Sequence, residues 1–321
     1  MQSSCATIPA PPPARALRII RAAHLGMCFG VRDAIDLALT QNGSPPLTIL
    51  GELAHNETVL AGLRARGLRM ENRVEDVTTP AVMITAHGAS DKTLHALKER
   101  GLRVLEGTCP LVHYAHRAVK TLVRENYHPV IIGRRDHVEV RGLTEDLAEF
   151  DVILTEDEVL RLAERPRFGV AAQTTQPMDR VRHLVGVMRR RFPCSEIRFI
   201  DTVCQPTKRR QESAVEVARQ SDVVIVVGGA HSNNTRELAA TCAQHCGRVH
   251  QVETAAGLRE EWFVEAERVG ITAGTSTPDW IVDGVEEWLQ RFSQRSRVGT
   301  GEQPSGGLPM TNYKFSITNS Q

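Results

Sequence analysis

Long apolar runs are missing from this 321-residue chain. No segment reaches the roughly 18 uninterrupted apolar residues that a membrane-spanning helix needs, so no contact with a membrane is expected. The first 16 residues, MQSSCATIPAPPPARA, contain no basic leader and no extended apolar stretch, which argues against a secretory signal. We interpret residues 1–16 as a flexible arm and expect a cytoplasmic protein.

An excess of charge of either sign is also missing. The 39 lysines and arginines nearly balance the 38 aspartates and glutamates, so no nucleic acid partner is expected and an anionic ligand needs a local site. The seven cysteines include no C-x-x-C pair, which argues against a disulfide framework and a usual structural zinc site. The sequence contains no Walker A loop, which argues against an NTPase, and no G-x-G-x-x-G motif, which argues against a nicotinamide-binding Rossmann domain.

The chain does contain short apolar runs that alternate with amphipathic helical patterns. This alternation is typical of α/β units with mostly parallel strands. Nine runs stand out and form three sets of three, in which the first run of each set leads to a cysteine and then to a helix. In chain order the runs are LRII, LTIL, AVMIT, LRVLE, PVIIG, FGVAA, IRFID, DVVIVVGG and RVGITAG.

Three cysteines occupy equivalent places in these sets. Cys28, Cys109 and Cys204 each follow a strand pattern and a tight polar turn, and they are 81 and 95 residues apart. In each set, a polar residue follows the second run, and it lies 27, 28 and 28 residues after the cysteine of that set. Another polar residue follows the third run, and it lies 59, 65 and 72 residues after the cysteine. These positions are His55, His137 and Ser232, then His87, Thr174 and Ser276. The spacing indicates a diverged internal triplication.

The triplication predicts one central site. Parallel sheets bind ligands beyond the carboxyl ends of their strands, so three units about a pseudo-threefold axis would bring the cysteines and a ring of polar side chains together. Three thiolates suit zinc or an iron–sulfur cluster, and a helix N-terminus lowers the pKa of a thiol. Ligands from three separate units favour the larger cofactor. Three cysteines would leave one iron of a four-iron cluster without a protein ligand.

Other polar and sulfur-containing residues have more than one interpretation. Cys5, Cys194, Cys242 and Cys246 are interpreted as small buried hydrophobes. Glu139, in RRDHVEV after the run PVIIG, would keep a proton near neutral pH in a closed cavity and could then serve as a proton source. On a charged edge strand it would be a surface residue. Both interpretations of Glu139 remain open at this point.

Nine segments, in order, resemble the 4-hydroxy-3-methylbut-2-enyl diphosphate reductases, the LytB or IspH family of the non-mevalonate isoprenoid pathway. The resemblance runs from about Arg18 to Leu289. Its carriers are GMCFGV, GELAHN, AHGAS, TCPLV, DHVEVRG, AAQTTQ, DTVCQPTKRRQ, GGAHSNNTREL and GITAGTSTPDW.

The resemblance implies an α/β fold of three similar α/β domains in a pseudo-threefold trefoil around one central [4Fe-4S] cluster. With the run boundaries above, the domains are expected at 17–108, 109–203 and 204–297, between the arm 1–16 and a C-terminal tail at 298–321. By this likeness Cys28, Cys109 and Cys204 ligate the cluster, and Glu139 is the proton donor with Thr174 beside it. Substrate contacts are expected from His55, His87, His137, Ser232, Asn233, Asn234 and Ser276.

The implied reaction is the two-electron reductive dehydroxylation of 4-hydroxy-3-methylbut-2-enyl diphosphate to isopentenyl and dimethylallyl diphosphate. A ferredoxin or flavodoxin is the implied electron donor. The segment GRRDHVE departs from the family's Gly-His-x-Gly-His-Pro-Glu at Arg134, Asp136 and Val138, and Asn233 stands where a second serine is common. One alternative is therefore a specialised paralogue that reduces a related allylic substrate, and another is a non-catalytic iron–sulfur sensor.

Overall fold

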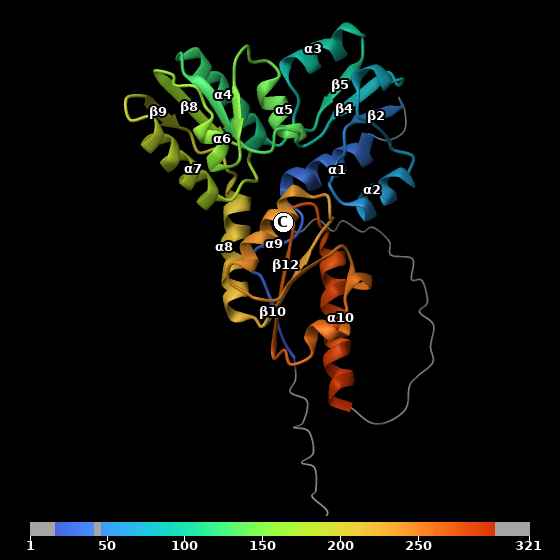
Figure 1. The fold of residues 1–321 in the computed structure, drawn as a ribbon. Coiled ribbons are helices and arrows are strands. Elements are labelled where there is room, and N and C mark those ends of the chain that lie inside the picture. Colours follow the sequence, from blue (N-terminus) through green and yellow to red (C-terminus); the bar gives the residue numbers. More distant parts are fainter. Residues whose placement is uncertain (1–16, 42–45, 299–321) are drawn as a thin grey trace, which may run out of the picture.

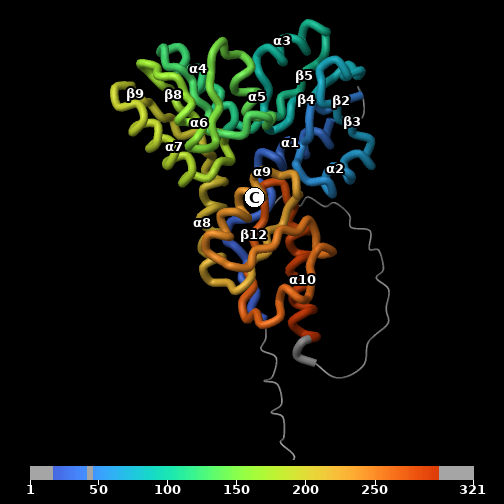
Figure 2. The backbone as a smooth tube through the Cα atoms, viewed as in Figure 1, coloured from blue at the N-terminus to red at the C-terminus, as the bar shows by residue number. Residues whose placement is uncertain are grey.

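The computed structural model describes residues 17–41 and 46–298 of the chain. This part folds into three lobes that meet in the middle of the molecule, and each lobe is built on its own parallel β-sheet (Figures 1 and 2). The predicted α/β class with three similar domains is therefore confirmed. The arm at 1–16, including Cys5, and residues 299–321 of the predicted tail lie outside the described residues.

Each sheet repeats the same four-strand order. At one edge lies a short strand, which pairs with the strand that precedes it in the chain. That central strand pairs with a second central strand, and the other edge is formed by the strand that precedes a cysteine. The first sheet is β3 (Arg69–Glu71), β2 (Leu47–Leu50), β4 (Ala81–Ile84) and β5 (Arg103–Glu106). The second is β7 (Asp151–Ile153), β6 (His128–Ile132), β8 (Arg167–Ala172) and β9 (Glu196–Phe199). The third is β11 (Val249–Val252), β10 (Val223–Val227), β12 (Arg268–Ala273) and β1 (Arg18–Arg21).

The edge strands β3, β7 and β11 were not predicted. They are short, and their sequences RME, DVI and VHQV are only partly buried. Central strands of a parallel sheet are covered on both faces and so form continuous apolar runs, such as the fully buried VVIVV of β10. An edge strand is paired on one side only and needs no such run, so it left no strong signal in the sequence.

The predicted grouping of strands was wrong in one respect. The strand before each cysteine pairs with the sheet of the preceding unit, because the chain crosses to the next sheet only with the helix that follows the cysteine. Thus β5 pairs with β4, β9 pairs with β8, and β1 pairs with β12 of the third sheet. Residues 18–21 therefore belong to the third sheet rather than to the first domain. The boundaries at Cys109 and Cys204 stay a prediction.

Helices cover the sheets, and several of them begin at residues with capping side chains. Ser90, for example, caps one helix and Ser232 another, each accepting a hydrogen bond from the backbone N–H three residues on. The helices are α1 (Phe29–Gln41), α2 (Glu57–Arg64), α3 (Asp91–Glu99), α4 (Pro110–Arg124), α5 (Val138–Thr144), α6 (Glu156–Leu160), α7 (Met178–Arg191), α8 (Gln205–Gln220), α9 (Asn233–Ala243) and α10 (Asp279–Val298). Short 3-10 turns lie at Val74–Asp76, Ala255–Gly257 and Glu260–Phe263.

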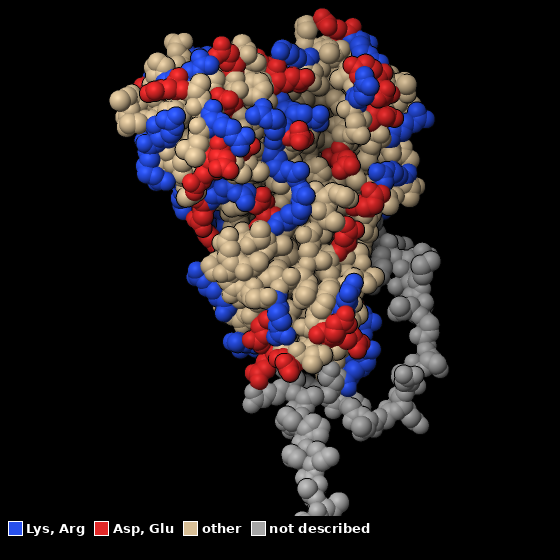
Figure 3. Space-filling view, viewed as in Figure 1, with Lys and Arg blue, Asp and Glu red and all other residues tan. Residues whose placement is uncertain are grey.

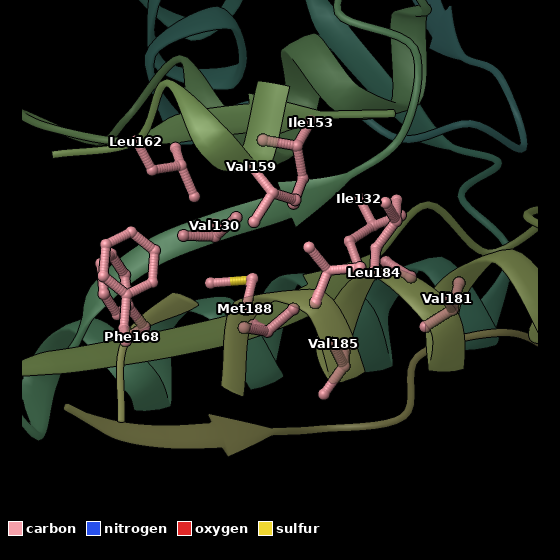
Figure 4. Close-up of a cluster of buried hydrophobic side chains, with 14 of the residues drawn as sticks. Val130, Ile132, Ile153, Val159, Leu162, Phe168, Val181, Leu184, Val185 and Met188 are labelled. Carbon is pink, nitrogen blue, oxygen red and sulfur yellow. The ribbon is translucent and has the colours of Figure 1, made fainter. Parts of the chain in front are cut away.

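The hydrophobic core is divided among the lobes, as the second lobe illustrates. Phe168 of β8 packs on Phe192, with ring centroids 4.9 Å apart, and Met188 of α7 lies in the same cluster (Figure 4). Burying a side chain of this size stabilises the fold by about 1.5–3 kcal/mol. Each lobe therefore holds its strand ends in place independently of the central site.

The surface agrees with the balanced composition. Basic and acidic side chains are intermixed over the two upper lobes (Figure 3). In the part of the chain that the structure describes, none of the helices combines the length and the apolar character that crossing a bilayer requires.

Candidate functional site

The three predicted cysteines each stand at the start of a helix. Cys109 and Cys204 are the N-cap residues of α4 and α8, and Cys28 directly precedes α1. Both α4 and α8 carry a proline in their first turn, where its fixed φ suits a helix and its missing N–H costs nothing. The chain therefore enters each helix at a fixed angle.

One hydrogen bond recurs at all three cysteines. Each cysteine N–H donates to the carbonyl oxygen of the residue two positions beyond the end of a central strand. The bonds run from Cys28 to Thr275 after β12 (3.0 Å), from Cys109 to Ala86 after β4 (3.1 Å) and from Cys204 to Thr174 after β8 (2.9 Å). The repeated bond shows that the three units place their cysteines in the same way.

The thiol groups lie near one another. A Cβ atom added to Gly30, in the first turn of α1, would lie 2.7 Å from the Sγ of Cys109, so this thiol rests against the helix that follows Cys28. The charge of Cys28 raises the pKa of both the Cys109 and Cys204 thiols, and so does the charge of Glu139. The structure thus brings the three cysteines and Glu139 together.

Burial, rather than the helix N-terminus, dominates the thiol pKa values. Burial raises the pKa of Cys109, against two backbone N–H groups of α4 that lower it. It raises the pKa of Cys204 to about 11, although Thr207 lowers it through a hydrogen bond to the thiol at 3.1 Å. The backbone N–H groups at the helix starts lower these pKa values, as expected, but burial outweighs them. A positively charged partner is needed to hold such thiols as thiolates.

Three histidines, one from each of three different loops, form a cluster. The ring centroids of His55 and His87 are 4.8 Å apart in a stacked arrangement, and the ring of His137 lies edge-on to both at 5.5 and 5.6 Å. Burial lowers the pKa of His87 well below its usual value, and the neighbouring His55 and His137 lower it further. Burial also lowers the pKa of His137 to about 3, with contributions from His55, Arg134 and Arg141. His87 and His137 are therefore neutral at pH 7.

Glu139 is buried, which excludes its interpretation as a surface residue. It lies in the first turn of α5 and not on an edge strand, and only 1% of it is exposed. Desolvation raises the pKa of its carboxyl group to about 7, although the Thr174 N–H, which donates to Oε1 at 2.7 Å, and the Thr174 side chain both lower it. A carboxylic acid with this pKa can hold a proton and release it near neutral pH.

Serine and asparagine side chains complete the ring. Ser232 caps α9 by accepting a hydrogen bond from the Thr235 N–H at 3.3 Å, and Ser276 donates to the carbonyl oxygen of His55 at 3.3 Å. The Nδ2 atoms of Asn233 and Asn234 and the Nε2 atom of His55 are buried with no hydrogen-bond partner. Unpaired buried donors are rare in folded proteins and mark a place where a ligand belongs.

Two cavities adjoin the cluster. The inner one is about 30 Å³, and it is lined by most of the predicted substrate contacts together with Glu139 and Thr175. The outer one is about 650 Å³ and shares His55 and His137 with the inner one. Thr174 does not line the inner cavity, and Asn233 lines only the outer one. A ligand larger than a water molecule needs the inner cavity to widen.

Two buried polar residues near the cysteines and the cluster were not predicted. Gln173 is fully buried, and its Oε1 accepts from the Arg134 N–H at 3.2 Å. Arg210 is 7% exposed, and its guanidinium donates to the carbonyl oxygen of Gly26, in the loop before Cys28, and to that of Pro206, in the first turn of its own helix α8. Both lie within segments quoted above, AAQTTQ and DTVCQPTKRRQ, but nothing in the sequence pattern marked them as buried.

Among the described residues, three further cysteines lie outside the ring of predicted site residues. Cys242 and Cys246 are buried in a hydrophobic cluster between α8 and β10, as predicted. Cys194 is exposed, so its predicted burial was wrong. It lies in the turn after α7, where the chain runs over the surface.

Residues 19–290 match a protein-family model described as LytB protein. The chain is 35% identical over 281 residues to a protein of Syntrophotalea carbinolica, which covers 87% of this chain and 100% of the relative. It is 34% identical over 288 residues to a protein of Aquifex aeolicus, and this match covers 88% of this chain and 99% of the relative. Both relatives are named 4-hydroxy-3-methylbut-2-enyl diphosphate reductase.

Two solved structures are also similar. The structure of an (E)-4-hydroxy-3-methyl-but-2-enyl diphosphate reductase, the terminal enzyme of the non-mevalonate pathway, matches with a TM-score of 0.62 and 35% identity over 86% of this chain and 99% of that one. The structure of the E-1-hydroxy-2-methyl-but-2-enyl-4-diphosphate reductase from Plasmodium falciparum matches with a TM-score of 0.77 and 26% identity over 86% and 88%. Fold and sequence thus agree over nearly the whole described chain.

Replacing Gly30 with alanine tests the packing of Cys109 against α1. The new Cβ would meet the Cys109 Sγ at 2.7 Å and its Cβ at 2.9 Å, so Gly30→Ala should destabilise the fold by about 1–3 kcal/mol. Gly284→Ala in α10 is the matched control, because no atom lies within 4 Å of its added Cβ and alanine favours a helix by about 0.5–1 kcal/mol. Anaerobic urea unfolding of both variants measures this. Equal stability of Gly30→Ala and wild type would contradict the described contact.

Proposed function

The chain belongs to the LytB family, and from this membership we propose that its central site reduces 4-hydroxy-3-methylbut-2-enyl diphosphate to isopentenyl and dimethylallyl diphosphate. The observation that carries the proposal is the meeting of three cysteines, one from the start of each unit, beside a buried carboxylic acid and a ring of unpaired hydrogen-bond donors. Overall, the substrate takes up two electrons and two protons, one C–O bond breaks, and water leaves.

We propose Cys28, Cys109 and Cys204 as the ligands of one [4Fe-4S] cluster. The donor set fits such a group, because these half-buried thiols lie near one another and need positive charge to become thiolates. Ligands from three separate units favour a polynuclear group over zinc. When bound, the cluster would supply electrons and one iron without a protein ligand.

Glu139 is proposed as the proton donor. Its carboxyl group, with a pKa of about 7, is protonated in about half of the molecules at neutral pH. The Thr174 N–H holds Oε1 at 2.7 Å and so fixes the direction of the acid. Thr174 links the acid to one of the cysteines, because its carbonyl oxygen accepts from the Cys204 N–H at 2.9 Å and its own N–H donates to Glu139. A proton delivered there converts a departing hydroxyl group into water.

Neutral side chains are proposed to bind the diphosphate. His137 Nδ1 accepts a hydrogen bond from the Glu139 N–H at 3.2 Å, which leaves the ring proton on Nε2 as a donor. His55, His87, Ser232, Asn234 and Ser276 line the same inner cavity, and the N-terminus of α9 adds backbone N–H groups that favour an anion. Closure of these donors around the diphosphate would exclude water from the hydroxyl end.

The electron donor and the compartment are also proposals. We propose a ferredoxin or flavodoxin as the donor, because plant-type ferredoxins have potentials near −400 mV, low enough for a demanding reduction. A thiol-ligated cluster suits a reducing compartment, and we place the protein in the cytoplasm on that ground.

Anaerobic purification and a turnover assay test the proposed function. The protein should contain about four irons and four sulfides per chain and should oxidise a reduced carrier only when the hydroxylated diphosphate is added. A longer or non-phosphorylated allylic alcohol is the control, and faster turnover of that compound would favour the specialised paralogue. A cluster without turnover would favour the sensor. A colourless, iron-free anaerobic preparation would refute the cluster itself.

The substitution Glu139→Gln separates proton donation from binding. Glutamine fills the same space but carries no acidic proton, so turnover should fall by about 10²–10⁴-fold while iron content and diphosphate affinity persist. In the wild type, the protonated acid is lost as pH rises through about 7, so the rate should be highest below that pH and fall above it. Glu164→Gln, at an exposed position of the same lobe, is the control. Unchanged turnover of Glu139→Gln would show that another group donates the proton.

A further inference from the structure

Arg134 and Asn233 lie in different lobes and contact each other beside the histidine cluster. Arg134 is the second residue after β6, and Asn233 is the first residue of α9. The Arg134 Nη1 donates to the Asn233 Oδ1 over 3.4 Å. Both residues depart from the pattern of the family, so two separate departures in the sequence meet at one point in space.

The contact lies in the wall of the outer cavity. Arg134 and Asn233 line this cavity of about 650 Å³ together with His55 and His137, which also line the inner one. A volume of this size accommodates a small-molecule ligand. The Arg134 backbone N–H donates to the buried Gln173 Oε1 at 3.2 Å, which fixes the start of the arginine side chain at this junction.

Arg134 supplies a positive charge in the wall of the outer cavity. It is half-buried, and within the described ranges no carboxylate forms an ion pair with it, whereas Arg73 in the same wall pairs with Glu75 at 3.3 Å. The histidines deeper in the site do not take this role, because burial keeps His87 and His137 neutral. A diphosphate therefore finds hydrogen-bond donors in the inner cavity and a cation at its edge.

Asn233 presents a donor whose direction follows from its contact with Arg134. The asparagine is 4% exposed. Because the guanidinium occupies its Oδ1, the amide is oriented so that Nδ2 is free, and this atom is buried without a partner. An anionic oxygen at the junction would accept from this amide and from Arg134 at once.

We propose that Arg134 and Asn233 form an anion subsite at the junction of the two cavities, which takes the terminal phosphate group of the substrate. The identity of the substrate rests on the proposed function, but the binding of a diphosphate group by this pair does not. Arg134 is then a specificity-determining residue that selects diphosphates over the corresponding monophosphates and alcohols.

Binding of inorganic diphosphate to the anaerobically prepared, cluster-loaded full chain tests the subsite, with isothermal titration calorimetry as the readout. Arg134→Gln should weaken the affinity by about tenfold to a hundredfold, the usual effect of losing a charged hydrogen-bond donor. Arg134→Lys keeps the positive charge but lacks the planar guanidinium group, so it should lose less affinity. Arg135→Gln is the control: this neighbour is exposed and its side chain donates to the Val152 carbonyl oxygen, so its affinity should stay within about twofold of wild type.

The pair should also act as a unit. Asn233→Ala should weaken diphosphate binding in the wild type but much less in the Arg134→Gln background, because the amide has then already lost its orienting partner. In turnover, Arg134→Gln should raise KM and leave kcat nearly unchanged. If Arg134→Gln does not fold, Arg134→Lys, which keeps the positive charge, replaces it in these measurements.

Two results would overturn the subsite. In the first, Arg134→Gln binds diphosphate with an affinity within about twofold of wild type, as Arg135→Gln should. In the second, the wild type shows no measurable binding of diphosphate. Diphosphate binding that depends on Arg134 in a protein without turnover would support the subsite and count against the reductase. Turnover with a KM that does not change in Arg134→Gln would support the reductase and overturn the subsite.

Discussion

The site depends on one backbone hydrogen bond made three times. Each cysteine N–H is held by a carbonyl group just beyond a central strand, and the helix that follows the cysteine packs on the next sheet of the chain. The bond therefore ties two neighbouring units together at the point where the thiol emerges. Because the same strand order and the same bond recur in every unit, the cysteines are brought to one centre by the backbone, before any ligand contributes.

Burial then sets the chemistry of that centre. It raises the pKa of Glu139 to about 7, raises those of Cys109 and Cys204, and lowers those of His87 and His137. Each of these shifts favours the neutral form of the group. The guanidinium groups of Arg210 near the cysteines and of Arg134 in the outer cavity are the positive charges that the protein itself supplies. The remaining positive charge that three thiolates need would come with a cofactor, and negative charge arrives with the diphosphate.

Several parts of this arrangement could be predicted from the sequence. The histidines follow buried central strands, and the cysteines follow the edge strands β1, β5 and β9. Apolar runs mark both kinds of strand in the sequence, and their spacing repeats three times. The edge strand β3 has no such run, and the pairing of β1 with β12 joins residues about 250 apart in the chain, which no local pattern reveals. The burial of Glu139 and the contact between Arg134 and Asn233 arise from packing between lobes. Such contacts require the fold itself.

Iron content of single cysteine variants tests the convergence of the three units most directly. Cys28→Ala, Cys109→Ala and Cys204→Ala would be purified anaerobically beside Cys194→Ala, whose cysteine is exposed and lies in the turn after α7. The account predicts that each of the first three variants loses most of its iron and its thiolate-to-iron absorption, and that Cys194→Ala keeps both. Full iron content in any one of the three would contradict the claim that one residue from each unit holds the same group.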